Sequence, residues 1–207
     1  MPCSGFSTVD RLAQGSDDVT SSSVRAFVLV THRWLGLGGA VFLSVIGVSG
    51  AAIVSTSVPG RSVLGSVHES LAMGRPGAWL VIAATCAAVA LEVGGIVLWW
   101  RRRVLTIRRH LGWRPALIDV HHVAGIVGLV LMLTMAVTGV LMAFVTPDDA
   151  PILRPWMVDL HTARAYPWPV KVIWACAALG FLIQAATGVL MWWKPRRGLA
   201  SAGITTR

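Results

Sequence analysis

Residues 34–56 read WLGLGGAVFLSVIGVSGAAIVST, and this uncharged apolar stretch decides the fold. At about 1.5 Å per residue, a helix of this length crosses the roughly 30 Å hydrocarbon core of a bilayer. Comparable apolar stretches occupy residues 78–100, 123–145 and 170–193. Backbone polar groups find no water inside a bilayer, so each stretch is expected to be a transmembrane helix. The sequence therefore predicts an all-α membrane protein, built as a bundle of four transmembrane helices.

The composition agrees with a membrane protein. Of the 207 residues, 55% are hydrophobic and 13% are charged, and the mean hydropathy is +0.69. A soluble domain carries about 25% charged residues. The net charge is +9, but the Lys and Arg residues lie between the apolar stretches and not on one soluble face. We therefore interpret them as topology signals and expect the partner to be a lipid bilayer and not a nucleic acid.

The distribution of basic residues predicts the orientation. Thirteen of the 18 Lys and Arg residues lie before the first span, between the second and third spans, or after the fourth. Cytoplasmic loops carry an excess of these residues, so both termini are expected in the cytoplasm. Residues 1–24 are polar and are expected to be a disordered cytoplasmic tail. Residues 25–197 are expected to form the transmembrane domain, and residues 198–207 a second cytoplasmic tail.

The chain is a two-fold repeat that includes its histidines. His32 begins the first span and His121 begins the third, 89 residues later. His68 precedes the second span and His161 precedes the fourth, 93 residues later. The same two offsets relate further matches, Ser49-Gly50 with Thr138-Gly139 and Gly95 with Gly188. The repeat unit is a helical hairpin, and the two hairpins run in parallel.

This repeat predicts a cofactor site at two levels of the membrane. His32 and His121 are expected on the cytoplasmic side, and His68 and His161 on the periplasmic side. If the hairpins pack around a pseudo-two-fold axis, the two members of each pair face one another. Two imidazoles that converge from opposite helices match the axial ligation of haem iron. The sequence therefore predicts two b-type haems, each held by one histidine pair.

The surrounding residues allow more than one interpretation. Gly36 and Gly125 each lie four residues after a predicted ligand and share its helix face, so they are expected to leave space for a macrocycle. Such glycines also permit close helix packing. His110 and His122 fall outside the repeat; His110 is expected to be solvated, and His122 to bind a propionate, a lipid headgroup or nothing. A lone interfacial histidine is more often a polar anchor than a ligand, so the repeat carries the prediction.

Glu92 is the formal charge that lies deep in a predicted span. A carboxylate in the bilayer is costly, and it is usually functional or neutral. One interpretation is a proton relay coupled to haem reduction. The other is a protonated side chain that forms a hydrogen bond with a neighbouring Ser or Thr.

Six short stretches of the sequence also carry a family resemblance. They are residues 31–37 (THRWLGL), 67–74 (VHESLAMG), 97–103 (VLWWRRR), 119–125 (DVHHVAG), 160–165 (LHTARA) and 187–193 (TGVLMWW). In their order and spacing they resemble the PepSY-associated transmembrane family, which includes iron-regulated inner-membrane proteins and ferric-siderophore reductases. Together they span about residues 31–197.

The resemblance implies a multi-pass protein of the bacterial inner membrane. It also implies a four-helix core that binds two b-type haems through His32, His68, His121 and His161. Larger members of the family carry periplasmic PepSY domains between their spans, whereas the loops here, near 57–77 and 146–169, are about 20 residues each. The chain looks like a short form, with little surface for recognising a large ferric chelate.

Three functions follow as hypotheses. The first is a membrane oxidoreductase of the ferric-reductase kind, which passes electrons from a quinol or a cytoplasmic flavoprotein reductase to ferric iron or a ferric chelate in the periplasm. The sequence contains no nucleotide-binding fingerprint, so a nicotinamide or flavin would belong to a partner. The second is a metal-handling or transport protein that binds iron or copper directly. The third is an accessory subunit of an iron-uptake system without haem. Catalytic residues are not identified by the sequence.

Overall fold

The computed structural model describes residues 8–56, 62–100, 103, 105–145 and 148–193. Within these ranges, four helices are long and apolar enough to cross a membrane: α1 (Thr8–Thr56), α3 (Arg75–Trp100), α4 (Trp113–Phe144) and α6 (Trp168–Trp193). The predicted all-α membrane fold is confirmed. Each apolar stretch lies in one of these helices, although α4 ends one residue before the predicted boundary.

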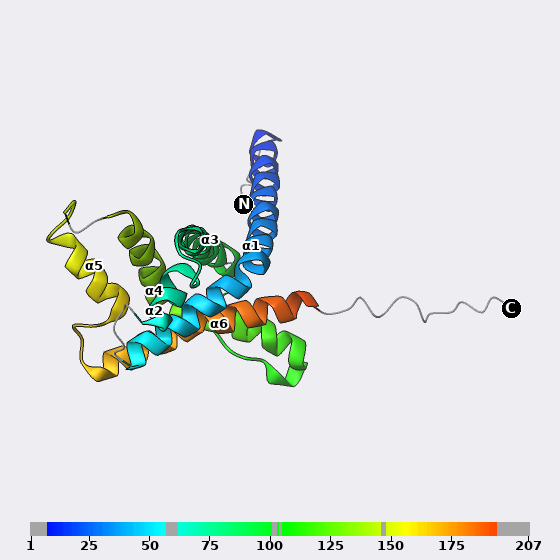
Figure 1. Cartoon of the computed structure of the whole chain (residues 1–207). Helices are drawn as coiled ribbons and strands as arrows, with labels where there is room; N and C mark the ends of the chain where they lie inside the picture. The colour runs from blue at the N-terminus through cyan, green and yellow to red at the C-terminus, as the bar shows by residue number, and fades with distance from the viewer. Residues whose placement is uncertain (1–7, 57–61, 101–102, 104, 146–147, 194–207) are drawn as a thin grey trace.

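The helix ends differ from the predicted boundaries on the N-terminal side. α1 begins at Thr8, so it enters the range 1–24 for which a disordered tail was predicted. Figure 1 shows that α1 changes direction along its length, and its first part stands away from the bundle. α4 begins at Trp113, ten residues before the predicted span, after a short 3-10 helix at Arg109–Leu111. Residues 1–7 and the predicted tail 198–207 lie outside the described residues.

Two short helices occupy the loops between the spans. α2 (Val63–Ser70) lies between α1 and α3, and α5 (Leu153–Thr162) lies between α4 and α6. Each ends at a residue in the left-handed conformation, Leu71 with φ 52° and Ala163 with φ 52°. His68 and His161 therefore do not lead directly into spans, as the sequence suggested. Each lies in the last turn of a separate short helix.

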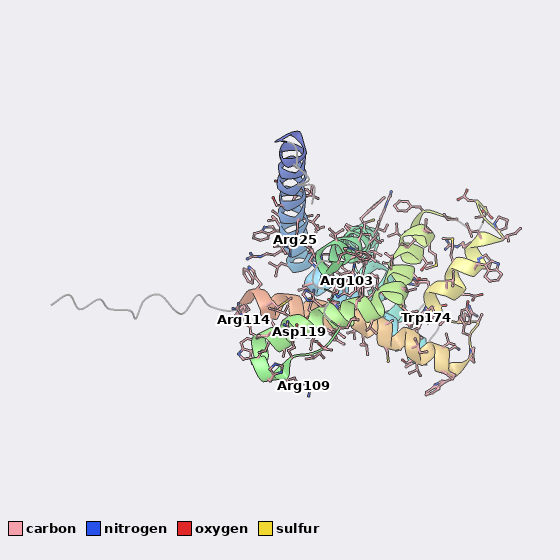
Figure 2. All side chains as sticks on the ribbon, turned by 180° about the vertical axis from the view of Figure 1, so that it is seen from behind. Arg25, Arg103, Arg109, Arg114, Asp119 and Trp174 are labelled. Carbon is pink, nitrogen blue, oxygen red and sulfur yellow. The ribbon has the colours of Figure 1, made fainter. Side chains whose placement is uncertain are left out.

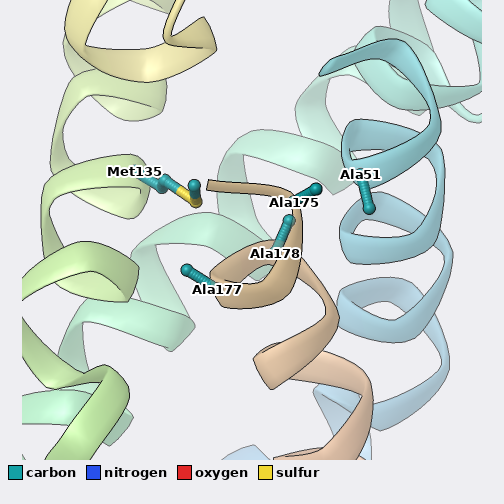
Figure 3. Close-up of a cluster of buried hydrophobic side chains, with 5 residues drawn as sticks. All are labelled: Ala51, Met135, Ala175, Ala177 and Ala178. Carbon is teal, nitrogen blue, oxygen red and sulfur yellow. The ribbon is translucent and has the colours of Figure 1, made fainter. Parts of the chain in front are cut away.

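The four long helices form a ring. α1 packs against α3 and α6, and α4 packs against the same two helices, so α1 and α4 occupy opposite corners. Small residues allow close packing, as is usual between membrane helices. Figure 3 shows one such contact, in which Ala51 of α1 and Met135 of α4 approach Ala175, Ala177 and Ala178 of α6.

One glycine in α1 shows how close the helices are. A Cβ atom on Gly47 would lie 2.6 Å from the carbonyl oxygen of Ala178, so a larger residue would push α1 and α6 apart. The outer surface is apolar, with Val41, Val127 and Val130 each at least 70% exposed. A contiguous apolar surface of this kind is suited to lipid.

The two ends of the bundle have different chemistry. Figure 2 shows Arg25, Arg103, Arg109 and Arg114 at one end, with Trp174 toward the other. We call the first the arginine end. The opposite end, where α2 and α5 lie, is called the short-helix end.

Candidate cofactor site

The structure brings the four repeat-related histidines together as two pairs. The ring centroids of His32 and His121 are 6.4 Å apart, with an angle of 83° between the ring planes. Those of His68 and His161 are 6.0 Å apart, with an angle of 52°. The first pair lies at the arginine end and the second at the short-helix end. The pairing is the one that the repeat predicts.

At the short-helix end, a main-chain carbonyl fixes the imidazole of His68. Its Nδ1 atom lies 2.9 Å from the carbonyl oxygen of Ile46 and 3.2 Å from Oγ of Ser49. A carbonyl oxygen only accepts, so Nδ1 must carry the proton and donate. The Ser49 hydroxyl already donates to the carbonyl oxygen of Val45, at 2.7 Å, and therefore accepts from the same Nδ1. Nε2 is left with a lone pair for a metal.

His161 repeats this arrangement 93 residues later. Its Nδ1 atom lies 2.9 Å from the carbonyl oxygen of Met135 and 3.2 Å from Oγ1 of Thr138. The Thr138 hydroxyl donates to the carbonyl oxygen of Thr134, at 2.6 Å. His161 therefore has the same tautomer as its repeat partner. Fixing the tautomer through the second ring nitrogen is characteristic of metal-bound histidines.

Burial keeps both of these imidazoles neutral. It lowers the pKa of His68 below its usual value of 6.5. Burial also lowers the pKa of His161 to about 4, and the neighbouring His68 contributes in the same direction. A neutral imidazole is the form that binds a metal. At neutral pH the pair can offer two lone pairs to one acceptor.

Two glycines give these imidazoles their space. A Cβ atom on Gly50 would lie 2.9 Å from Cε1 of His68, and one on Gly139 would lie 3.1 Å from Cε1 of His161. These positions are equivalent in the repeat. Any larger side chain on α1 or α4 at this level would displace the ring it faces.

At the arginine end, α6 supports His121 through two polar side chains. Nδ1 of His121 lies 2.8 Å from Oγ1 of Thr187. The Thr187 hydroxyl donates to the carbonyl oxygen of Ile183, at 2.6 Å, so it accepts from the imidazole. Gln184 donates from Nε2 to the carbonyl oxygen of His121, at 2.9 Å. The tautomer of His121 is therefore the same as that of the short-helix pair.

His32 has no comparable support. Its buried Nδ1 atom forms no hydrogen bond of good geometry with a described residue, and the ring has only a weaker contact with the main chain of Leu91. The nearest positions on α3 are glycines: a Cβ atom on Gly94 would lie 3.5 Å from Nδ1, and one on Gly95 would lie 3.7 Å from Cε1. His32 therefore lacks the side-chain acceptor that His121 has in Thr187.

Gly36 and Gly125, which were predicted to leave space for a macrocycle, each lie against the neighbouring helix. A Cβ atom on Gly36 would lie 3.8 Å from Leu91, and one on Gly125 would lie 3.1 Å from Nε2 of Gln184. Both glycines therefore face a side chain of the neighbouring helix, one turn from the ligand. The glycines that approach the imidazoles are those at positions 50, 94, 95, 139 and 188. The repeat paired all of these except Gly94 in the sequence, and that was the signal for them.

The remaining candidates are not members of the two pairs. His110 is exposed in the 3-10 helix. The ring of His122 is 6.3 Å from that of His121, on the same helix and not across the bundle. Glu92 is half-buried on α3, and within the described ranges no residue forms a hydrogen bond with its carboxylate. Among the described residues, no contact of Glu92 supports a proton relay, and none supports a protonated side chain bonded to a Ser or Thr.

One ion pair was not anticipated from the sequence. The Asp119 side chain is completely buried, two residues before His121, and accepts two hydrogen bonds from the Arg108 guanidinium, at 2.9 and 3.0 Å. It also accepts from the main-chain N–H of Arg108, at 3.0 Å. This clamp ties the loop before α4 to the helix that carries His121. The sequence feature that could have indicated this ion pair is an aspartate next to an apolar span.

A metal ion bound without haem would need a cluster of ligating side chains. In the part of the chain that the structure describes, no group of three or more His, Cys, Asp or Glu side chains is arranged to hold one. The histidines instead meet two at a time across the bundle.

Fold and site together define a multi-pass membrane protein made of two helical hairpins with a histidine pair at each end. The sequence matches the family model described as the PepSY-associated TM region over residues 55–154 and 145–194, about two thirds of the chain. The chain therefore belongs to the PepSY-associated transmembrane family. His68, His121 and His161 lie within the matched residues, and His32 precedes them. No curated protein and no solved structure matches the chain.

Proposed function

We propose that the protein is a dihaem b-type electron-transfer protein of the bacterial inner membrane. The observation that carries the proposal is the meeting of two imidazole pairs across the bundle, at centroid distances of 6.4 and 6.0 Å. Metal–imidazole nitrogen bonds of about 2.0–2.1 Å place two rings on opposite sides of one metal with centroids about 6 Å apart. The spacing of both pairs fits axial ligation of one iron by each pair.

The histidines and glycines of each pair have different roles in such a site. His32 with His121, and His68 with His161, would each hold one haem iron, and such a haem would supply one-electron redox chemistry. The Nε2 atoms of His68 and His161 would keep their lone pairs available to the iron, because their Nδ1 atoms donate to main-chain carbonyls. Gly50 and Gly139 leave room for the rings. These contacts hold the ligands in one geometry, which favours fast electron exchange over binding of a substrate at the iron.

The two sites are spaced to serve opposite faces of a membrane. Along α1, 18 residues separate His32 from Gly50, and along α4, 18 residues separate His121 from Gly139. At 1.5 Å per residue this is about 27 Å, against a hydrocarbon core of about 30 Å. Apolar residues such as Leu43 and Met132 fill the level between them. The arrangement suits the passage of electrons and not of hydrated ions.

The basic residues support an orientation for this transfer. The arginine end would face the cytoplasm, with both termini, and the short-helix end would face the periplasm. Electrons would enter from a quinol or a cytoplasmic flavoprotein reductase. They would leave to ferric iron or a ferric chelate outside, which makes the protein a membrane oxidoreductase of the ferric-reductase kind.

The short-helix end offers an acceptor a place to approach. A cavity of about 540 Å³ opens beside α5, the helix that carries His161, and Arg154, Asp159 and Arg164 contribute to its lining. A small acidic chelate would find two cations there.

An absorption spectrum tests the proposal directly. The full-length protein, expressed with ample haem supply and purified in detergent, is measured as a reduced-minus-oxidised difference and quantified by pyridine haemochrome. We expect about two low-spin b-type haems per chain. A colourless protein would reject electron transfer through haem. Metal uptake by proteoliposomes would then separate direct metal transport from an accessory role.

A further inference from the structure

The arginine-end pair is held asymmetrically. Nδ1 of His121 donates to the Thr187 hydroxyl at 2.8 Å, whereas the buried Nδ1 of His32 has no hydroxyl acceptor and its ring has only a weaker contact with the main chain of Leu91. The repeat explains the difference, because the offset of 93 places Gly94 where the second hairpin has Thr187. The first hairpin therefore lacks the hydroxyl group that would complete the site.

The space for that hydroxyl is present. A Cβ atom on Gly94 would lie 3.5 Å from Nδ1 of His32 and 3.5 Å from Cγ1 of Val28, which are ordinary van der Waals distances. A small side chain fits here without moving either neighbour. The second hairpin carries threonine in the same place, on the same helix face. Packing therefore does not require glycine at this position.

A missing acceptor changes how strongly an imidazole binds a metal. When Nδ1–H donates to an acceptor, the ring becomes more basic and its Nε2 a stronger ligand. A stronger ligand favours the ferric state, so hydrogen bonds to axial histidines lower the reduction potential. His68, His161 and His121 all have such an acceptor. His32 is the weaker donor of its pair.

We propose that Gly94 is a positioning residue for electron transfer, which raises the reduction potential of the arginine-end haem by withholding from His32 the hydroxyl acceptor that Thr187 gives to His121. The inference rests on the proposed function. A haem bound there would then have the higher reduction potential of the two, which would favour an electron at the arginine end.

The test restores the hydroxyl. The reduction potentials of both haems are measured by a spectroscopic redox titration of the full-length, haem-loaded protein and of its Gly94→Ser variant. Gly94→Ala is the matched control, because it adds the same Cβ atom without the hydroxyl. We expect Gly94→Ser to lower the reduction equilibrium constant of the higher-potential haem on the order of tenfold, about 59 mV for one electron. Gly94→Ala should leave both potentials near those of the parent.

A second variant tests the same idea from the other hairpin. Thr187→Val removes the acceptor of His121 at nearly constant volume, and we expect it to raise the potential of the same haem. Repeating the titrations in a His68→Ala background, which keeps only the arginine-end site, assigns the shift to that haem. Together the variants keep the inference testable if one of them fails to fold.

The outcomes separate the inference from the function on which it rests. Two bound haems whose potentials do not respond to Gly94→Ser would overturn the inference and leave the proposed function standing. Equal shifts in the Ser and Ala variants, or a shift confined to the other haem, would also overturn it. Absence of haem from the parent protein would reject both.

Discussion

The two hairpins are nearly identical at one end of the molecule and different at the other. At the short-helix end, each histidine bonds a carbonyl at 2.9 Å and a hydroxyl at 3.2 Å, and each ring faces a glycine. At the arginine end, α6 supplies Gln184 and Thr187, where α3 has Leu91 and Gly94 at the equivalent positions. The second hairpin also has the buried Asp119, where the first has Val30.

This comparison shows at which of the two histidine pairs the sequences of the hairpins can differ. The short-helix pair takes its main support from main-chain carbonyls of α1 and α4, and these remain as long as the helices do. The arginine-end pair depends on side chains, which single substitutions can remove. We therefore expect both histidines of the short-helix pair to be supported in the same way. Substitutions that change the ligand strength of a histidine are expected at the arginine end.

Removing a ligand should give the largest effect. We expect His32→Ala and His121→Ala each to lose the same one of about two haems, and His68→Ala and His161→Ala each to lose the other. The physical reason is that one imidazole alone cannot complete a two-ligand site. Haem content and the difference spectrum of each purified variant measure this.

The two remaining histidines provide the controls for this experiment. His110→Ala and His122→Ala should keep both haems, because neither residue belongs to one of the two histidine pairs. If His32→Ala and His121→Ala lost spectrally different haems, the pairing across the bundle would be wrong.

Filling the space beside a ligand should have the next largest effect. Gly50→Val and Gly139→Val place atoms where a Cβ alone would already lie 2.9 and 3.1 Å from a ring carbon. We expect haem retention at the short-helix end to weaken roughly 10–100-fold in each variant, with the arginine-end haem intact. Gly38→Val is the matched control, since nothing described lies within 4 Å of a Cβ atom there. Similar losses in all three variants would point to helix propensity and not to the ligand.

The Asp119–Arg108 clamp should matter for stability more than for ligation. Arg108→Ala leaves a buried carboxylate without its counter-ion, so we expect the melting temperature to fall by several degrees. Arg109→Ala, on the exposed neighbour, should leave it unchanged. The double variant Arg108→Ala/Asp119→Ala should recover part of the loss, because no unpaired charge remains buried. A double variant less stable than Arg108→Ala would show that the clamp is not what Arg108 contributes.

The sequence predicted the fold better than it predicted the surroundings of the site. Apolar length fixes the transmembrane spans, because hydrogen bonding of the backbone in lipid leaves no alternative to helices. Histidine spacing also predicted which rings meet, since two parallel hairpins bring equivalent positions to one level. These features depend on periodicity and repetition, which a single sequence displays.

Other features depend on contacts between distant residues. The short helices α2 and α5 turn their histidines back toward Gly50 and Gly139, and no local pattern states where a loop helix will dock. The role of Gly36 was assigned from its spacing to His32, but the adjacent helix places Leu91 against it. Asp119 is bonded to a residue 11 positions away in a loop, so its charge gave no indication of its partner.

The smallest effect is expected from the hydroxyl groups at the short-helix end. Ser49→Ala and Thr138→Val each remove an acceptor at 3.2 Å from a histidine, but the carbonyl oxygens of Ile46 and Met135 remain at 2.9 Å. The imidazole tautomer is therefore kept, and each change should cost no more than about 0.5–1.5 kcal/mol in stability. Thermal unfolding and the haem potentials measure the two consequences. Since Thr187 is the acceptor that the structure shows for His121, its removal should shift a potential more than either of these. Shifts of the haem potential that are equal at both ends would mean that hydroxyl groups, and not main-chain carbonyls, hold the imidazoles of His68 and His161. The two histidine pairs would then be supported in the same way.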